Sequence, residues 1–223
     1  MTLSRRLTAR ALGACAPLLL AGCSLLGGGE KAVLYRLGSD VPAATASAPA
    51  GTVPILIARP ELPPGADGDR ILTVHGQEAA HVAGSRWVGP APDLLAELLA
   101  DSLARTAGPA YVLRGGGSPQ FVLTTGVTRF AAFYEAGPSG PPVVRVAAQV
   151  ELRRTGASRP LAVALHSAQR QAAENRVSAI ADAFGGASRE LTDDIARWAQ
   201  QQAGRSDQGT LPSADERGPA GRR

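Results

Sequence analysis

The strongest constraint on the fold is an alternation of apolar and polar residues over residues 143–154, in which Ala147 is the one apolar residue at an inner polar position. The apolar side chains are Val144, Val146, Ala148, Val150 and Leu152, and between them stand Arg145, Gln149, Glu151 and Arg153. A two-residue period predicts a β-strand with one face in the core and one in water. Strands are also predicted over 120–134 and 161–170, and Gly, Pro and Ser turns join all three into an antiparallel meander. The last of these strands alternates Leu161, Val163 and Leu165.

Two amphipathic helices are predicted to cover this sheet. Residues 92–107 begin with Pro and Asp, which suit the first turn of a helix, and carry a stripe of leucines. From about residue 175 to 202, apolar residues recur every three or four positions over the whole length. Gly185 and Gly186 interrupt this second pattern and predict a kink there.

The remaining predicted strands cover residues 31–37, 53–59, 70–74 and 111–114. The order of elements predicts a single α+β domain over 31–203, with a largely antiparallel sheet and two main helices packed on one face. Residues 204–223 are rich in Gly, Ser, Pro, Asp and Arg, so they predict a disordered tail.

A basic start followed by an apolar run predicts export. Residues 1–10 hold three arginines and no acidic residue, and residues 11–21 form a run that only Gly13 and Pro17 break. The run is too short to span a bilayer as a stable helix and is typical of a secretory signal peptide. The Arg5-Arg6 pair also resembles a twin-arginine signal, although positive charge that orients the signal in the membrane is the simpler explanation.

The apolar run ends in Leu20-Ala21-Gly22-Cys23, which resembles the lipobox of bacterial lipoproteins at every position. The resemblance implies a signal peptide over 1–22, cleavage between Gly22 and Cys23, and acylation of the Cys23 thiol. Residues 23–30, with three consecutive glycines, then predict the lipidated cysteine and a flexible tether. An ordinary secretory signal with a chance cysteine is the alternative interpretation.

Sorting and charge indicate where the mature protein works. Ser24, rather than Asp, follows the lipidated cysteine, and resemblance to enterobacterial lipoproteins then implies the outer membrane, with the domain facing the periplasm. The chain has a formal net charge of +4, but signal removal takes three of its 23 Lys and Arg and none of its 19 Asp and Glu. Because the mature chain is nearly neutral, a basic patch for nucleic acid has no support.

No arrangement of residues predicts catalysis. The three histidines, His75, His81 and His166, are too few and too irregularly spaced for a metal site. Asp67 and Asp69 are the nearest approach to an acid–base pair, but they stand in a Pro-Pro-Gly turn, where solvated carboxylates are expected. We therefore expect no enzyme activity, no metal and no cofactor.

A series of short motifs carries a family resemblance. Tyr35-Arg36-Leu37 lies in the first strand, residues 53–57 lead to a Leu-Pro pair, and Asp69-Arg70 precedes the next strand. Arg86-Trp87-Val88-Gly89-Pro90 follows, just before the leucine-rich helix. In this order, with the lipobox and the long C-terminal helix, the motifs resemble the ABC-type transport auxiliary lipoprotein family, whose members accompany MCE-domain lipid transport systems of Gram-negative envelopes. The resemblance covers about residues 33–202.

The resemblance implies a non-catalytic lipoprotein subunit that docks a periplasmic MCE-domain protein and assists phospholipid transport between membranes. Its partners would be that MCE protein and the ABC permease and ATPase of the same system, and self-association into a homo-oligomer is a further expectation. Asp69, Arg70, Arg86 and Trp87 form the predicted partner interface, while burial of Trp87 under the first helix is the alternative. Other interpretations of the chain are a lipoprotein that assists envelope assembly or activates a peptidoglycan synthase, and a lipid-anchored hydrolase.

Overall fold

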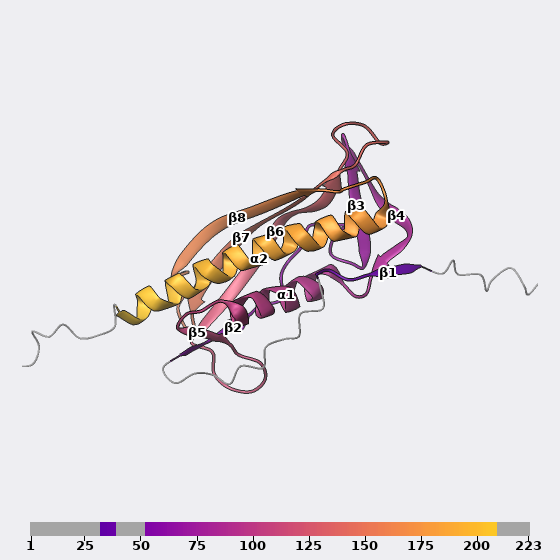
Figure 1. The fold of residues 1–223 in the computed structure, drawn as a ribbon. Coiled ribbons are helices and arrows are strands. Elements are labelled where there is room, and N and C mark those ends of the chain that lie inside the picture. Colours follow the sequence, from indigo (N-terminus) through magenta and orange to yellow (C-terminus); the bar gives the residue numbers. More distant parts are fainter. Residues whose placement is uncertain (1–31, 39–51, 209–223) are drawn as a thin grey trace, which may run out of the picture. The chain divides into compact units, whose positions relative to one another are not determined.

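The centre of the fold is the antiparallel meander that the alternation predicts. It consists of β6 (Phe121–Phe133), β7 (Val143–Arg154) and β8 (Ala162–Gln171), with β7 paired between the other two (Figure 1). The structure is a computed structural model that describes residues 32–38 and 52–208. The predicted signal peptide, Cys23 and the tether therefore lie outside the described residues, as does the tail beyond residue 208.

Five further strands complete an eight-stranded sheet. They are β1 (Val33–Tyr35), β2 (Val53–Ile57), β3 (Arg70–His75), β4 (Glu78–Trp87) and β5 (Ala110–Val112). Six strands follow the order β1-β4-β3-β6-β2-β5, in which β3 and β2 both pair with one edge of β6. β7 pairs with the opposite edge of β6, and β8 pairs with β7. Among the described residues, four of the seven strand pairs are parallel, so the sheet is mixed, but these parallel pairs are short and the long ladders β6–β7 and β7–β8 are antiparallel.

Strands β2 and β3 pair with the same edge of β6 at opposite ends. β2 lies against residues 121–123, and β3 lies against residues 132–133. The segment between β2 and β3 crosses the gap, where the N–H of Glu61 donates to the Thr125 carbonyl at 3.0 Å and the N–H of Val127 donates to the Glu61 carbonyl at 2.7 Å. The middle of β6 therefore lacks a full neighbouring strand on this edge.

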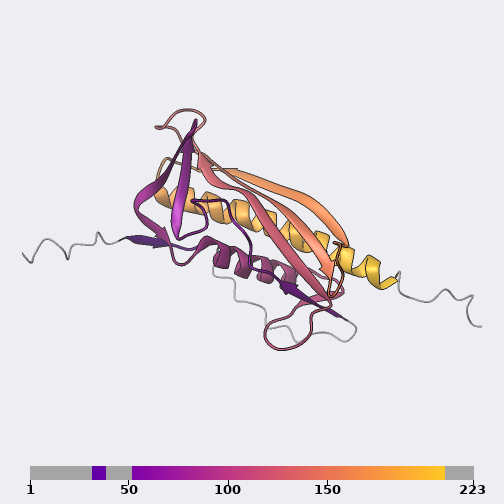
Figure 2. The same ribbon diagram turned by 180° about the vertical axis from the view of Figure 1, so that it is seen from behind.

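Both helices cover the same face of the sheet, which confirms the predicted α+β arrangement (Figures 1 and 2). α1 (Ala91–Arg105) packs on α2 (Val177–Gln208), and α2 also lies over β7 and β8. Buried polar contacts fix this layer, since the Ser102 and Thr192 hydroxyls lie 3.0 Å apart. The Gln200 side-chain amide exchanges two 2.8 Å hydrogen bonds with the backbone of Ala110, which joins α2 to β5. Within the described residues, no helix is long and apolar enough to cross a membrane.

α2 is one continuous helix, which runs through Gly185 and Gly186 and beyond its predicted end at residue 202. It extends to Gln208, so the prediction of a disordered tail from residue 204 is wrong for the last turn, residues 204–208. Gly185 and Gly186 lie inside the helix, where they allow close approach rather than a break. A Cβ on Gly185 would lie 3.2 Å from the backbone nitrogen of Gly38, and one on Gly186 would lie 2.6 Å from the Arg170 side chain.

Candidate docking surface

The sheet face opposite the helices carries large exposed apolar side chains at its β8 edge. Leu161, Val163 and Leu165 are 45%, 51% and 78% exposed. In the β7–β8 register, Val163 stands opposite Glu151 and Leu165 opposite Gln149. These five residues are called the β8 surface below. Contiguous exposed apolar side chains with a polar rim are typical of interaction sites.

The backbone of β8 is also open along its outer edge. The N–H of Ala172 donates to the Pro142 carbonyl at 2.9 Å, which places the even-numbered residues of β8 in hydrogen-bonded pairs with β7. The antiparallel alternation then turns the N–H and C=O of Val163, Leu165 and Ser167 away from β7. In the part of the chain that the structure describes, β8 pairs with β7 alone. A long edge strand without proline or lysine is a template for pairing with another chain.

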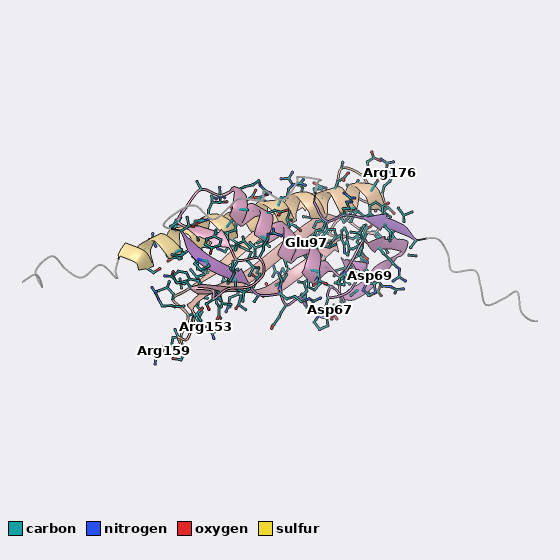
Figure 3. The ribbon with its side chains drawn as sticks, turned by 90° about the horizontal axis from the view of Figure 1, so that it is seen from below. Asp67, Asp69, Glu97, Arg153, Arg159 and Arg176 are labelled. Carbon is teal, nitrogen blue, oxygen red and sulfur yellow. The ribbon has the colours of Figure 1, made fainter. Side chains whose placement is uncertain are left out.

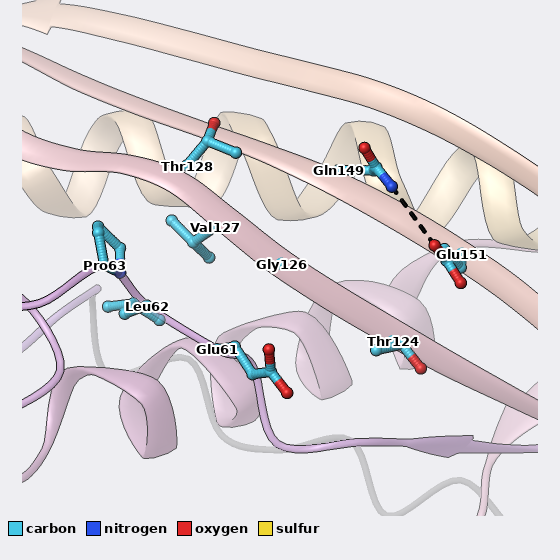
Figure 4. Close-up of a pocket in the computed structure, with 9 residues that line it drawn as sticks. All are labelled: Glu61, Leu62, Pro63, Thr124, Gly126, Val127, Thr128, Gln149 and Glu151. Carbon is cyan, nitrogen blue, oxygen red and sulfur yellow. Dashed lines mark hydrogen bonds between the residues drawn. The ribbon is translucent and has the colours of Figure 1, made fainter.

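A groove on the same face adjoins the β8 surface (Figure 4). Its floor is the middle of β6, at Thr124, Gly126, Val127 and Thr128, and residues 61–63 of the crossing segment form one wall. Gln149 and Glu151 form the other wall, and the Gln149 amide donates to the Glu151 carboxylate at 3.3 Å. The groove has a volume of about 430 Å³. Because Gln149 and Glu151 belong to both features, the groove and the β8 surface form one continuous face.

The residues predicted from sequence as a partner interface lie elsewhere, and one of them is buried. Arg86 donates to both carboxylate oxygens of Asp69, at 3.0 and 3.2 Å, and the exposed Arg70 stands opposite Arg86 in the strand register. Trp87 is only 1% exposed and packs edge-on against Phe184, with 5.3 Å between ring centroids. Its assignment to a surface interface is therefore wrong, and the alternative of a buried indole is correct.

The histidines and the aspartate pair are not gathered into a site. His75 is exposed, and the Nε2 atom of His81 lies 2.8 Å from the Gly65 carbonyl oxygen. Asp67 is exposed, whereas Asp69 is engaged by Arg86. Over residues 32–38 and 52–208, no group of three or more His, Cys, Asp or Glu is placed to hold a metal ion.

His166 differs from the other histidines because it lies between β8 and α2. Its ring packs edge-on against Trp198 at 6.0 Å, and its Nε2 atom is buried without a hydrogen-bond partner. Burial lowers the pKa of His166 below its ordinary value of 6.5, and the nearby Asp194 carboxylate opposes this effect. The fold therefore favours a neutral imidazole under α2.

We expect the stability of the protein to fall as His166 is protonated. Since the pKa is lower in the folded than in the unfolded chain, the stabilising contribution is complete above pH 6.5 and is lost as the pH falls through the folded pKa. The His166→Gln variant should lose less of its melting temperature between pH 7 and pH 5 than the unsubstituted protein. His75→Gln, at an exposed histidine, is the matched control. If the melting temperatures of His166→Gln and His75→Gln fall equally between pH 7 and pH 5, the prediction is contradicted.

Comparison with known proteins gives a family match and two strong structural likenesses. The family model described as "ABC-type transport auxiliary lipoprotein component" matches residues 35–196. The crystal structure of protein XCC0632 from Xanthomonas campestris, of the family DUF330, superposes with a TM-score of 0.66 at 21% identity, covering 79% of this chain and 99% of that one. A crystal structure of an uncharacterized protein superposes with a TM-score of 0.60 at 15% identity, covering 76% and 99%. No curated protein matches the chain. At these identities the two structures show a shared fold only.

Proposed function

The chain belongs to the ABC-type transport auxiliary lipoprotein component family, and from this premise we propose that it is the non-catalytic lipoprotein subunit of an ABC/MCE lipid transport system. In this role it docks the periplasmic MCE-domain protein and assists the passage of phospholipid between membranes. The permease and ATPase of the same system are its indirect partners. Acylation at Cys23 after cleavage behind Gly22 holds the protein in the outer membrane, with the domain in the periplasm.

The observation that carries this proposal is the β8 surface. An auxiliary subunit without chemistry of its own acts by binding, and binding needs an exposed, chemically distinct surface. The open backbone edge at Val163, Leu165 and Ser167 offers hydrogen bonds to an incoming strand, and the apolar side chains supply buried area. The outward side chains of β8 at Val163, Leu165 and Ser167 carry no charge, so an uncharged, apolar strand of the MCE protein fits this edge best.

We expect Leu165→Asp to weaken capture of the MCE protein by at least about tenfold, because a charge on an edge strand blocks strand addition and costs buried apolar area. Co-purification of the two proteins from detergent-solubilised membranes measures this loss. Leu56→Asp is the matched control, since Leu56 is a 40% exposed leucine on a different strand, β2, and its change should leave capture intact.

A second variant separates backbone pairing from side-chain contact. Ser167→Pro removes the outward N–H of β8 together with the serine hydroxyl and leaves Leu165 in place, and proline is tolerated where the N–H of an edge strand faces solvent. Loss of capture by Ser167→Pro, with an unchanged melting temperature, would support strand addition. Full capture by a folded Leu165→Asp variant would contradict docking at the β8 surface, and failure of the unsubstituted protein to capture the MCE protein would contradict the choice of partner.

A further inference from the structure

A second exposed apolar cluster lies where the chain enters the fold. Leu34 of β1 is 60% exposed and Val88, just after β4, is 48% exposed, whereas Val33, at 55%, lies on the other face of β1. The N–H of Val88 donates to the Tyr35 carbonyl at 2.8 Å, which places Val88 directly beside β1. These side chains belong to neither the groove nor the β8 surface.

Arginines stand beside this apolar cluster. In the strand register, Leu34 of β1 is opposite Arg86 of β4, and Arg86 is opposite Arg70 of β3, so the three side chains form one row on the same sheet face. Asp69 neutralises Arg86 through their ion pair at 3.0 Å. Arg70 has no ion-pair partner among the residues that the structure describes, so the row carries positive charge next to apolar side chains.

The position of the cluster in the chain limits what can cover it. Only nine residues, 24–32, separate Cys23 from Val33. The ten residue steps from Cys23 to Val33 reach at most about 36 Å when fully extended, because each residue spans 3.3–3.6 Å. If Cys23 is acylated, as in the proposed function, β1 stays within that distance of the bilayer surface.

We propose that the surface formed by Leu34, Val88, Arg70 and Arg86 lies against the phospholipid bilayer that holds the lipid anchor. Apolar side chains enter the boundary between headgroups and acyl chains, while arginine is attracted to anionic phosphates. The proposal rests on the lipid anchor at Cys23, but it adds a defined orientation of the domain on the membrane.

The proposed membrane surface and the proposed docking surface lie on the same sheet face, away from the helices, but at opposite ends of the domain. Asp69, next to the arginine row, and Arg159, just before the start of the β8 surface, lie at opposite ends of the view in Figure 3. A domain that rests on lipid at its β1 end therefore presents Leu161 and its neighbours at the far end. A partner that approaches from the periplasm would meet this far end first.

Depth-dependent quenching tests the orientation on the acylated, full-length mature protein. The chain has two cysteines, one of them in the predicted signal peptide, so a Leu34→Cys variant presents a single free thiol for an environment-sensitive dye. The protein is reconstituted in vesicles of phosphatidylethanolamine and phosphatidylglycerol that contain lipids spin-labelled near the headgroup. Leu161→Cys, at an exposed leucine of the far end, is the matched control.

We expect the dye at position 34 to be quenched at least about threefold more than the dye at position 161. Adding Arg70→Glu should reduce the quenching at position 34, and so should high salt, because exposed charges are screened. Equal quenching at both positions, while the protein still floats with the vesicles, would overturn the proposal. Protection of position 34 only after addition of the MCE protein would overturn it too, in favour of a protein partner. Loss of flotation of the unsubstituted protein would instead show that the anchor itself is absent.

Discussion

Cys23→Ser is expected to move the protein from the membrane fraction to the soluble periplasmic fraction. Lipidation of a lipobox cysteine forms a thioether at its sulfur, and a serine hydroxyl does not replace that thiol. A single myristoyl-sized chain binds membranes only reversibly, with an association constant of about 10⁴ M⁻¹, whereas two or more chains hold a protein stably. Removal of every acyl chain should therefore leave only the weak attraction of the Leu34–Arg70 row, which ordinary washing disrupts.

The measurement is fractionation together with metabolic labelling by a radioactive fatty acid. Cys15→Ser is the matched control, because Cys15 lies inside the predicted signal peptide and its loss should change neither labelling nor fractionation. Retention of the Cys23→Ser variant in membranes after salt washing would show that the lipobox interpretation is wrong or that a partner holds the protein. Labelling of that variant would exclude Cys23 as the acylated residue.

The elements that the sequence predicts well are those whose local pattern is complete. The alternation over Val143–Arg154 reproduces β7 with both its limits, and the leucine stripe places α1 within two residues at each end. β4 is the strand that the pattern does not predict, because Glu78–Trp87 holds three alanines and a glycine and half of its residues are exposed. Its strand geometry comes from pairing with β3 and β1, which lie elsewhere in the chain.

Local sequence patterns do not predict which strands pair in parallel. β2 inserts between β5 and β6, which follow it by more than fifty residues, and no periodicity within Val53–Ile57 specifies either neighbour. Gly185 and Gly186 illustrate the same limit. As isolated residues they predict a kink, yet in the fold they make room for Gly38 and Arg170, which approach α2 from distant segments.

The alternation of apolar and polar residues in β8 does not predict the candidate docking surface. The pattern at Leu161, Val163 and Leu165 predicts a strand, but it does not tell which of its two faces the helix covers. In the structure α2 lies over the small residues Ala162 and Ala164, because small side chains let a helix approach the sheet closely. The large apolar side chains consequently face away from α2, and only the tertiary structure reveals them as a surface.

Phe184→Ala should destabilise the domain more than any other truncation considered. Phe184 is fully buried in the N-terminal half of α2, where its ring centroid lies 5.3 Å from that of Trp87 and 5.1 Å from that of Phe130. Truncation of a buried phenylalanine costs about 3–5 kcal/mol, from lost burial and from the cavity that remains. Domains of this size unfold with a free energy of roughly 5–15 kcal/mol, so the variant should retain only a small margin of stability.

Thermal unfolding measures this loss. A change of 1 kcal/mol lowers the melting temperature by about 2–4 °C in a chain of this length, so Phe184→Ala should lower it by roughly 6–20 °C. Phe184→Leu keeps most of the side-chain volume and should lose clearly less, and Leu165→Ala, at a 78% exposed position, should stay within about 0.5 kcal/mol of the unsubstituted protein. If Phe184→Ala and Leu165→Ala unfold at the same temperature, the packing of α2 against Trp87 and Phe130 is not what holds the helix layer on the sheet.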